Sequence, residues 1–435
     1  MHTLEQLRRG ELAGVSRLDL SAGLTEFPRE IFALADSLEV LNLTGNRLKA
    51  LPADLSRLHK LRILFCSDND FTVLPEMLGE CPQLEMIGFK SCRIRQLPAS
   101  ALPPRLRWLI LTGNQLDSLP DELGGCAGLQ KLALAGNQLR ALPASMADLG
   151  RLELLRIAAN RLDALPGWLL ELPRLAWLAF AGNPCSDAGE AQALRHNPLP
   201  PIPREQIQLG TVLGQGASGV IHRADWQRAG QPAQAMAAKL FKGEVTSDGL
   251  PRSEMAACIA AGDHPNLIRV AGQLAERADG APGLLMELID PSFRPLAGPP
   301  SLASCTRDCY APEHRFAFDE ALRMSRGVAS AVAHLHGRGI LHGDLYAHNL
   351  LANGHGDCLL GDFGAASFLP REAGALQRIE ARAFGYLLEE LLERCAADDQ
   401  PQRQQRLAQW RDRCLGDNVL ERPDFASLEA GLANI

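Results

Sequence analysis

The chain has few of the features that mark secreted, membrane-spanning or nucleic-acid-binding proteins. Its eleven cysteines are scattered among 435 residues without a CxxC pair, and none joins a histidine pair at zinc spacing. This pattern favours free thiols over a disulfide framework or a zinc site. No apolar run approaches the roughly 18 residues that a membrane-spanning helix requires. The net charge of −7 offers no basic surface for nucleic acid or an anionic membrane.

The N-terminus also lacks the apolar stretch of a signal peptide, because residues 1–10 are polar. We therefore expect a cytoplasmic protein, although secretion by a route without a signal peptide stays open. The composition is that of a globular chain, with 22% charged and 46% hydrophobic residues. Its length favours two or three domains.

A period of 23 residues runs through residues 13–187. Each period carries the pattern seen at Leu38-x-x-Leu41-x-Leu43-x-x-Asn46-x-Leu48. One step of 45 between asparagines hides a repeat centred on Cys92, and Gly23 takes the same place one period before Asn46. The asparagines are Asn46, Asn69, Asn114, Asn137, Asn160 and Asn183.

These eight copies resemble the leucine-rich repeat family. The resemblance implies an α/β solenoid in which each repeat contributes one short strand and neighbours stack to bury their leucines. We expect each asparagine to be buried and to bond the backbone of the adjacent coil. Thr3 is expected to cap a short helix at the start of the array.

One outward-facing position of each repeat strand is mostly apolar. Six of its seven occupants are apolar and the seventh is Lys131. An apolar stripe that faces water often marks a binding surface. We therefore predict that a protein partner or substrate binds the concave face of the array, although apolar residues on a partly shielded sheet would explain the stripe as well. The predicted partner-binding residues are Val40, Ile63, Met86, Trp108, Leu154 and Trp177.

A proline-rich segment separates this array from the rest of the chain. Asn197-Pro-Leu-Pro-Pro-Ile-Pro203 excludes helix and a central strand. The sequence thus predicts a repeat domain over 1–190, a linker over 191–205 and a second domain over 206–435.

The second domain opens with a glycine-rich turn between two expected strands. Gly214-x-Gly216-x-x-Gly219-Val220 can lay backbone N–H groups over phosphates because glycine has no Cβ in the way. The same spacing occurs in dinucleotide-binding folds. Here no long helical pattern and no ribose-binding acid follow the loop, which disfavours that interpretation.

Lysine is almost absent from the second domain, which makes Lys239 informative. After residue 200 only Lys239 and Lys242 occur. A lysine retained where arginine is otherwise preferred suggests a compact charge on a phosphate. Glu254 begins an alanine-rich helical stretch and is expected to pair with Lys239.

Two further motifs supply oxygen ligands and a base. His342-x-Asp344-x-x-x-x-Asn349 is followed by Asp362-Phe363-Gly364. Asp344 can accept the proton of an attacking hydroxyl, while Asn349 and Asp362 can hold Mg²⁺. In this order the motifs describe transfer of a nucleotide γ-phosphoryl group with magnesium.

Together the motifs resemble the eukaryotic-type protein kinase fold over about 206–432, so the whole chain is similar to leucine-rich repeat protein kinases without their membrane span. The resemblance implies an α+β bilobal domain that uses ATP and Mg²⁺ to phosphorylate serine or threonine hydroxyls. It also implies that Lys239 pairs with Glu254. It makes Asp344 the catalytic base and Met286 the gatekeeper. The residues implied at the nucleotide are Gly214, Gly216, Gly219, Val220, Ala237, Lys239, Met286, Glu287 and Leu288.

The sequence also departs from the kinase pattern. Gly343 replaces an arginine that normally receives an activation-loop phosphate, and Tyr346 replaces a phosphate-contacting lysine. Only fifteen residues separate Gly364 from Glu380, and Ser367 carries their sole hydroxyl. The segment that normally supports a peptide substrate is therefore reduced. Three interpretations remain: an active protein kinase whose repeats hold the substrate, a pseudokinase that serves as a scaffold, and a small-molecule phosphotransferase of similar fold.

Overall fold

The computed structural model describes residues 2–196, 201–216, 218–242, 245–275, 281–370, 372–396 and 401–435. Packing divides the chain into two compact units, Met1–Arg174 and Leu175–Ile435. The functional boundaries at residues 190 and 206 stay predictions. Helix α2 (Pro184–His196) shows that residues 191–196, expected as linker, are helical, since the prolines begin only after them. Residues 197–200 of the proline-rich segment lie outside the described residues.

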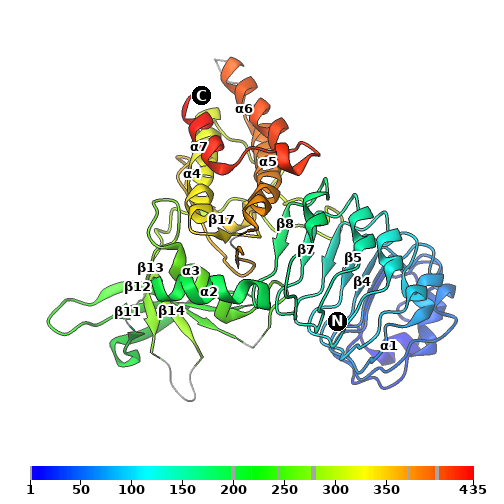
Figure 1. The fold of residues 1–435 in the computed structure, drawn as a ribbon. Helices are drawn as coiled ribbons and strands as arrows, with labels where there is room; N and C mark the ends of the chain where they lie inside the picture. The colour runs from blue at the N-terminus through cyan, green and yellow to red at the C-terminus, as the bar shows by residue number, and fades with distance from the viewer. Residues whose placement is uncertain are drawn as a thin grey trace. The chain divides into compact units, whose positions relative to one another are not determined.

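The first unit is built on a parallel sheet with one short strand per repeat (Figure 1). Helix α1 (Leu4–Arg8) precedes it, and Thr3 and Gln6 form a capping box there, which confirms the expected cap. The strands of this unit are β1 (Arg17–Asp19), β2 (Val40–Asn42), β3 (Ile63–Phe65), β4 (Met86–Gly88), β5 (Trp108–Ile110), β6 (Lys131–Ala133) and β7 (Leu154–Arg156).

Short 3-10 turns form the side of each repeat opposite its strand. They usually begin just after the Leu-Pro pair that closes the repeat pattern, as at Pro143 and Pro166. The turns are η1 (Arg29–Leu34), η2 (Leu55–Arg57), η3 (Glu76–Glu80), η4 (Ala99–Ala101), η5 (Asp121–Gly125), η6 (Ala144–Asp148) and η7 (Gly167–Leu170).

The repeat asparagines join neighbouring coils, as the sequence predicts. The amide oxygen of Asn114 accepts the N–H groups of Cys92 (3.1 Å) and Ile94 (2.9 Å) from the preceding repeat. Its amide nitrogen donates to the carbonyls of Phe89 and Leu111, both at 2.8 Å. Each such side chain satisfies backbone groups that the turn would otherwise bury without partners.

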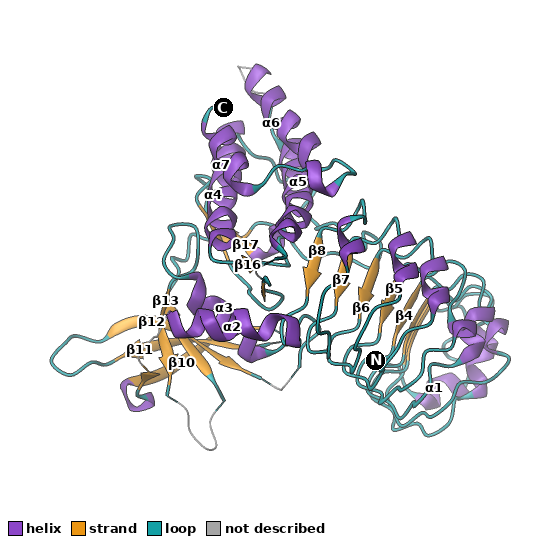
Figure 2. Ribbon diagram, viewed as in Figure 1, coloured by secondary structure: helices purple, strands orange, loops and turns teal. Residues whose placement is uncertain are grey.

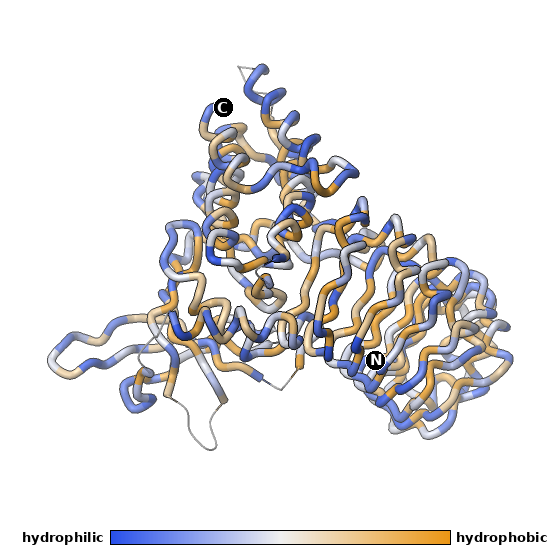
Figure 3. The backbone as a smooth tube through the Cα atoms, viewed as in Figure 1, coloured by the Kyte–Doolittle hydropathy of each residue, from blue (hydrophilic) through white to orange (hydrophobic). Residues whose placement is uncertain are grey.

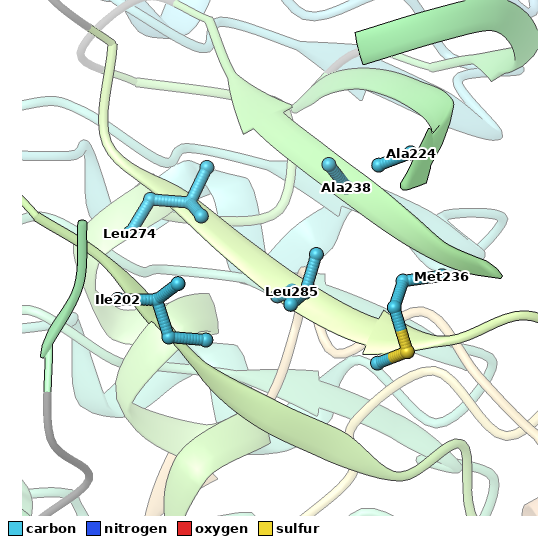
Figure 4. Close-up of a cluster of buried hydrophobic side chains, with 6 residues drawn as sticks. All are labelled: Ile202, Ala224, Met236, Ala238, Leu274 and Leu285. Carbon is cyan, nitrogen blue, oxygen red and sulfur yellow. The ribbon is translucent and has the colours of Figure 1, made fainter. Parts of the chain in front are cut away.

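The second unit begins with one more repeat strand, β8 (Trp177–Ala179), followed by α2. Its six-stranded sheet has the order β10-β11-β12-β14-β13-β9. Residues of several of its strands form one hydrophobic cluster, shown in Figure 4: Ile202, Ala224, Met236, Ala238, Leu274 and Leu285. The strands are β9 (Pro201–Ile202), β10 (Ile207–Gln215), β11 (Gly219–Trp226), β12 (Gln234–Phe241), β13 (Val270–Leu274) and β14 (Gly283–Glu287).

Helix α3 (Pro251–Ala261) lies alongside α2 (Figure 1), and the hydroxyl of Ser253 donates to Glu190 (2.9 Å). The other helices come later in the chain of this unit (Figure 2). They are α4 (Phe318–Gly337), α5 (Gln377–Arg394), α6 (Pro401–Cys414) and α7 (Phe425–Ala433).

Short strands and turns complete the helical part of the unit. The strands are β15 (Arg294–Pro295), β16 (Ile340–Leu341), β17 (Leu350–Ala352), β18 (Cys358–Leu360) and β19 (Ser367–Phe368). The turns are η8 (Arg204–Gln206), η9 (Ala347–Asn349), η10 (Gly374–Leu376) and η11 (Val419–Glu421). Hydrophobic and hydrophilic stretches alternate along α4 and α5 (Figure 3), as expected for helices with one buried face. Within the described ranges, no helix combines the length and hydropathy needed to cross a membrane.

Candidate active site

The glycine-rich turn joins the antiparallel strands β10 and β11. The N–H of Gly216 donates to the carbonyl of Gly219 (3.0 Å), which closes the turn. A Cβ on Gly219 would lie 2.5 Å from the carbonyl oxygen of Leu240, so packing alone demands glycine there. A Cβ on Gly214 or Gly216 would meet open space. Glycine at these two positions leaves the backbone accessible to a ligand instead.

Lys239 lies on β12, directly opposite Ile221 of the neighbouring strand. Its ammonium group forms an ion pair with Glu254 of α3, and their side chains are only 13% and 2% exposed. Burial opposes the charge on Lys239, but the negative charges of Glu254 and Asp362 outweigh it and raise the pKa of the lysine. Burial raises the pKa of the Glu254 carboxyl. Glu254 thus holds the ammonium group of Lys239 in place beside Asp362.

The residues expected at an adenine ring lie on β12 and at the end of β14. Ala237 is buried and stands directly opposite half-buried Met286. Glu287 is exposed and Leu288 is half-buried, just where the strand ends. Val220 of β11 is paired with Leu240 of β12. These residues therefore share one sheet with Lys239 and the glycine-rich turn.

Asp344 is held by hydrogen bonds within its own loop. The amide nitrogen of Asn349 donates to the Asp344 carboxylate (2.8 Å) and to its backbone carbonyl (2.9 Å). Nε2 of His342, which is fully buried, donates to the carbonyl of Gly361 (3.0 Å). His342 thereby ties this loop to the residue that precedes Asp362.

Asp362 has a left-handed backbone, with φ of 53°, a conformation that few residues other than glycine adopt and that aspartate tolerates better than most. Its carboxylate accepts the N–H of Gly364 (3.2 Å). It faces a cavity of about 180 Å³ together with the glycine-rich turn and Lys239. The lining residues are Gly216, Ser218, Gly219, Ile221, Lys239, Thr246, Asp248, Asp362 and Gly364.

The donor set at this position suits magnesium. Since the nitrogen of Asn349 is engaged by Asp344, its amide oxygen remains as the acceptor, and Asp362 adds a carboxylate. Oxygen donors of these kinds are what Mg²⁺ prefers. The residues present therefore fit the ion.

The structure adds one contact that sequence reasoning missed. The buried carboxylate of Asp308 accepts the imidazole Nδ1–H (2.7 Å) and the backbone N–H (3.0 Å) of His348. Burial lowers the pKa of His348, but the hydrogen bond and charge of Asp308 outweigh burial and raise it. No pattern marks Asp308, because it comes from an irregular segment 40 residues earlier in the chain.

Comparison with known families agrees with this geometry. Residues 207–384 match the family described as protein tyrosine and serine/threonine kinase. Residues 104–162 and 37–58 match two leucine-rich repeat families. The chain joins leucine-rich repeats to a protein kinase domain.

Relatives resemble parts of the chain. Human leucine-rich repeat and calponin homology domain-containing protein 1 is 33% identical over 126 residues, or 28% of this chain and 17% of that protein. A probable serine/threonine-protein kinase of Arabidopsis thaliana is 28% identical over 108 residues, or 24% of this chain and 13% of that protein. The human PH domain leucine-rich repeat-containing protein phosphatase 1 is 31% identical over 93 residues, which are 21% of this chain and 5% of that protein. The chain thus spans less than a fifth of these relatives.

The kinase domain has an unusual neighbour at its catalytic loop, the strand β8. The indole ring of Trp177 stacks on Tyr346, with centroids 4.1 Å apart and planes 5° apart. Its N–H donates to the carbonyl of Leu345 (3.0 Å), and the side chain is 1% exposed. Trp177 is therefore closed to an external partner, which corrects its predicted role as an exposed partner-binding residue. The ring is part of the interior of the second unit.

The remaining apolar positions do not form an exposed stripe either. Ile63, Met86 and Leu154 are buried, while Val40 and Trp108 are half-buried. Strands lie only about 4.8 Å apart in a sheet, so neighbouring side chains shield one another. The ammonium group of Lys131 also lies over the Trp108 ring, 4.5 Å from its centroid. The expectation of a water-facing apolar stripe is corrected accordingly.

Proposed function

We propose that the chain is an ATP- and Mg²⁺-dependent protein kinase, of the serine/threonine type, in which residues 206–435 transfer the γ-phosphoryl group to a protein hydroxyl. The observation that supports this most is one cavity lined by the glycine-rich turn, Lys239 and Asp362. The glycine-rich turn, the Lys239–Glu254 ion pair and both metal-binding residues of the kinase pattern are present, while Tyr346 replaces one phosphate-contacting lysine.

Each group has a distinct part in the transfer. Lys239, held by Glu254, binds phosphate oxygens, and the N–H groups of the glycine-rich turn cover them. Asp344 accepts the proton of the substrate hydroxyl, whose oxygen forms a bond to the γ-phosphorus as the bond to the β-phosphate oxygen breaks and ADP leaves. When bound by Asn349 and Asp362, Mg²⁺ neutralises the phosphate charge.

A pseudokinase that acts as a scaffold is the second candidate. The reduced segment after Asp362 favours it. So does Tyr346, which stands where a phosphate-contacting lysine is expected and is covered by the ring of Trp177. A small-molecule phosphotransferase is the third candidate. The glycine-rich turn with Val220 weighs against it.

Transfer from labelled ATP should separate these candidates. We expect the wild-type chain to label protein substrates, and Asp344→Asn to reduce the rate by about 10²- to 10⁴-fold while Mg·ATP still binds, because only the proton acceptor is lost. The matched control is Asp357→Asn, an exposed carboxylate further along the same region.

Three results would count against the proposal. A transfer rate in Asp344→Asn equal to that of the wild type would show that the Asp344 carboxylate is not the proton acceptor. Nucleotide binding without any transfer would favour the scaffold. Labelling of small alcohols or amines, and of no protein, would favour the small-molecule enzyme.

The repeat unit is proposed to recruit a protein partner or substrate, since leucine-rich repeats suggest protein interaction. Val40 and Trp108 keep partly accessible side chains on the strand face. A cytoplasmic location and the lack of nucleic-acid binding remain proposals that accord with the charge of −7.

A further inference from the structure

The short segment after Asp362 is anchored to the last repeat. The hydroxyl oxygen of Ser367 accepts the N–H groups of Phe180 (2.9 Å) and Ala181 (3.0 Å), which follow β8. Ser367 is fully buried, and β19 pairs with β16 next to the catalytic loop. Since Ser367 carries the only hydroxyl between Gly364 and Glu380, this segment offers no accessible phosphorylation site.

The last repeat also contacts the catalytic loop and the helix behind it. Trp177 stacks on Tyr346 on the loop and on Tyr386 of α5, at 5.5 Å and 21°. Its hydrogen bond to Leu345 joins the loop one residue after Asp344. The indole therefore fixes the loop against the central helix.

Two residues stand at positions that contact the activation segment in the kinase pattern, and here both contact the last repeat. Gly343 stands where the phosphate-receiving arginine is expected, and a Cβ there would lie 2.7 Å from the carbonyl oxygen of Leu178. Arg422 stands where an arginine normally pairs with a glutamate of the activation segment. It is fully buried, and its guanidinium donates to the carbonyls of Gly416 (2.9 Å) and Leu175 (3.3 Å).

We propose that residues 175–181 replace the activation segment within the same chain, with Trp177 as a positioning residue that holds Asp344 in its working geometry without phosphorylation. This inference rests on the proposed kinase activity. The repeat strand supplies the contacts that an ordered, phosphorylated segment would supply elsewhere. Activity is then independent of phosphorylation of this segment.

Steady-state kinetics of the full-length protein test the positioning role. The readout is phosphate release from Mg·ATP, which needs no protein substrate. We expect Trp177→Ala to lower kcat at least about tenfold, because small displacements of reacting groups are costly, with less than about a twofold change in KM for ATP, since the residue is not at the nucleotide. Trp177→Phe should keep most of the activity because it retains an aromatic ring over Tyr346. Trp168→Ala, which alters a tryptophan of η7, is the matched control.

A second measurement does not depend on activity. Hydrogen exchange of the peptide that covers residues 342–349 should be faster in Trp177→Ala and close to wild type in Trp177→Phe. If Trp177→Ala does not fold, Ser367→Ala, which removes the acceptor of two N–H groups, should give the same pattern in milder form. Treatment of the wild type with a protein phosphatase should leave kcat unchanged.

The outcomes are distinguishable. An active wild type whose kcat and loop exchange are the same in Trp177→Ala overturns the positioning role and leaves the kinase proposal intact. A loss of kcat after phosphatase treatment overturns the independence from phosphorylation. A wild type that binds Mg·ATP but releases no phosphate contradicts the kinase proposal, and loop exchange then still decides whether Trp177 positions the loop.

Discussion

Buried Glu380 and half-buried Glu390 of the kinase domain differ in pKa because their partners differ. Burial opposes the charge on Glu380, but hydrogen bonds and charge from His336, together with the N–H of Gly343, outweigh it and lower its pKa. Burial dominates at Glu390, where the charge of Asp308 adds to it, and the pKa rises to about 7. The hydroxyl of Tyr310 donates to Glu390 (3.1 Å) and offsets only part of this.

This difference predicts a pH-dependent effect of Glu390→Gln. A carboxyl whose folded pKa is raised to about 7 stabilises the fold below its ordinary pKa of 4.5, and this contribution is lost as pH rises through 7. The amide cannot ionise, so we expect it to raise the unfolding free energy by about 1–3 kcal/mol at pH 8, with little effect at pH 4.5. Denaturant unfolding at both values measures this. The control is Glu393→Gln, a carboxyl that is 65% exposed. An equal gain at both values would contradict the assignment.

Among the elements, β8 explains the glycine beside the catalytic aspartate. Gly343 has φ of 76°, and its missing side chain leaves room for the carbonyls of Leu178 and Ala365. Gly339, four residues earlier, has φ of 72°, but a Cβ there would meet nothing within 4 Å. The two glycines therefore share a left-handed backbone that would strain other residues, and they differ in crowding.

Alanine substitutions at these glycines should separate strain from collision. Gly339→Ala should cost about 1 kcal/mol through its left-handed backbone alone. Gly343→Ala should cost about 1–3 kcal/mol more, because its Cβ would lie 2.6–2.7 Å from two carbonyl oxygens. Thermal unfolding of both variants measures the difference. Equal losses would show that β8 does not restrict Gly343.

The repeat period and the ordered motifs allowed the repeat strands and much of the candidate site to be predicted from sequence. The period of 23 predicted the strands, because short spacings within each repeat encode local geometry. The order of the motifs placed Lys239, Asp344 and Asp362 in one domain. The same period aligned Trp177 with Trp108 and so predicted a shared, exposed face. It could not reveal that the neighbour of Trp177 is Leu345, because that contact spans 168 residues and has no local signal.

For the whole molecule, recognition and chemistry are proposed to belong to different units. Each unit has its own core. A substitution on the strands of the first unit should therefore affect how a protein substrate is held without affecting how ATP is used.

Trp108→Ala tests this separation. We expect KM for a protein substrate identified with labelled ATP to rise about 5- to 30-fold, as for the loss of one aromatic contact worth about 1–2 kcal/mol. KM for ATP should stay the same. Trp168→Ala, on η7 and away from the strand face, is the control. If Trp108→Ala leaves the protein KM unchanged, the strand face around Trp108 does not bind the substrate.

The bond between Trp177 and Leu345 also has a consequence for biosynthesis. The two residues are 168 positions apart. At roughly 5–20 residues per second, the ribosome releases the tryptophan on the order of 8–34 s before its partner. During that interval the repeats that precede it can already fold, while the indole lacks the tyrosine that later covers it. The nascent chain therefore carries an uncovered aromatic surface until the catalytic loop is synthesised and closes over it.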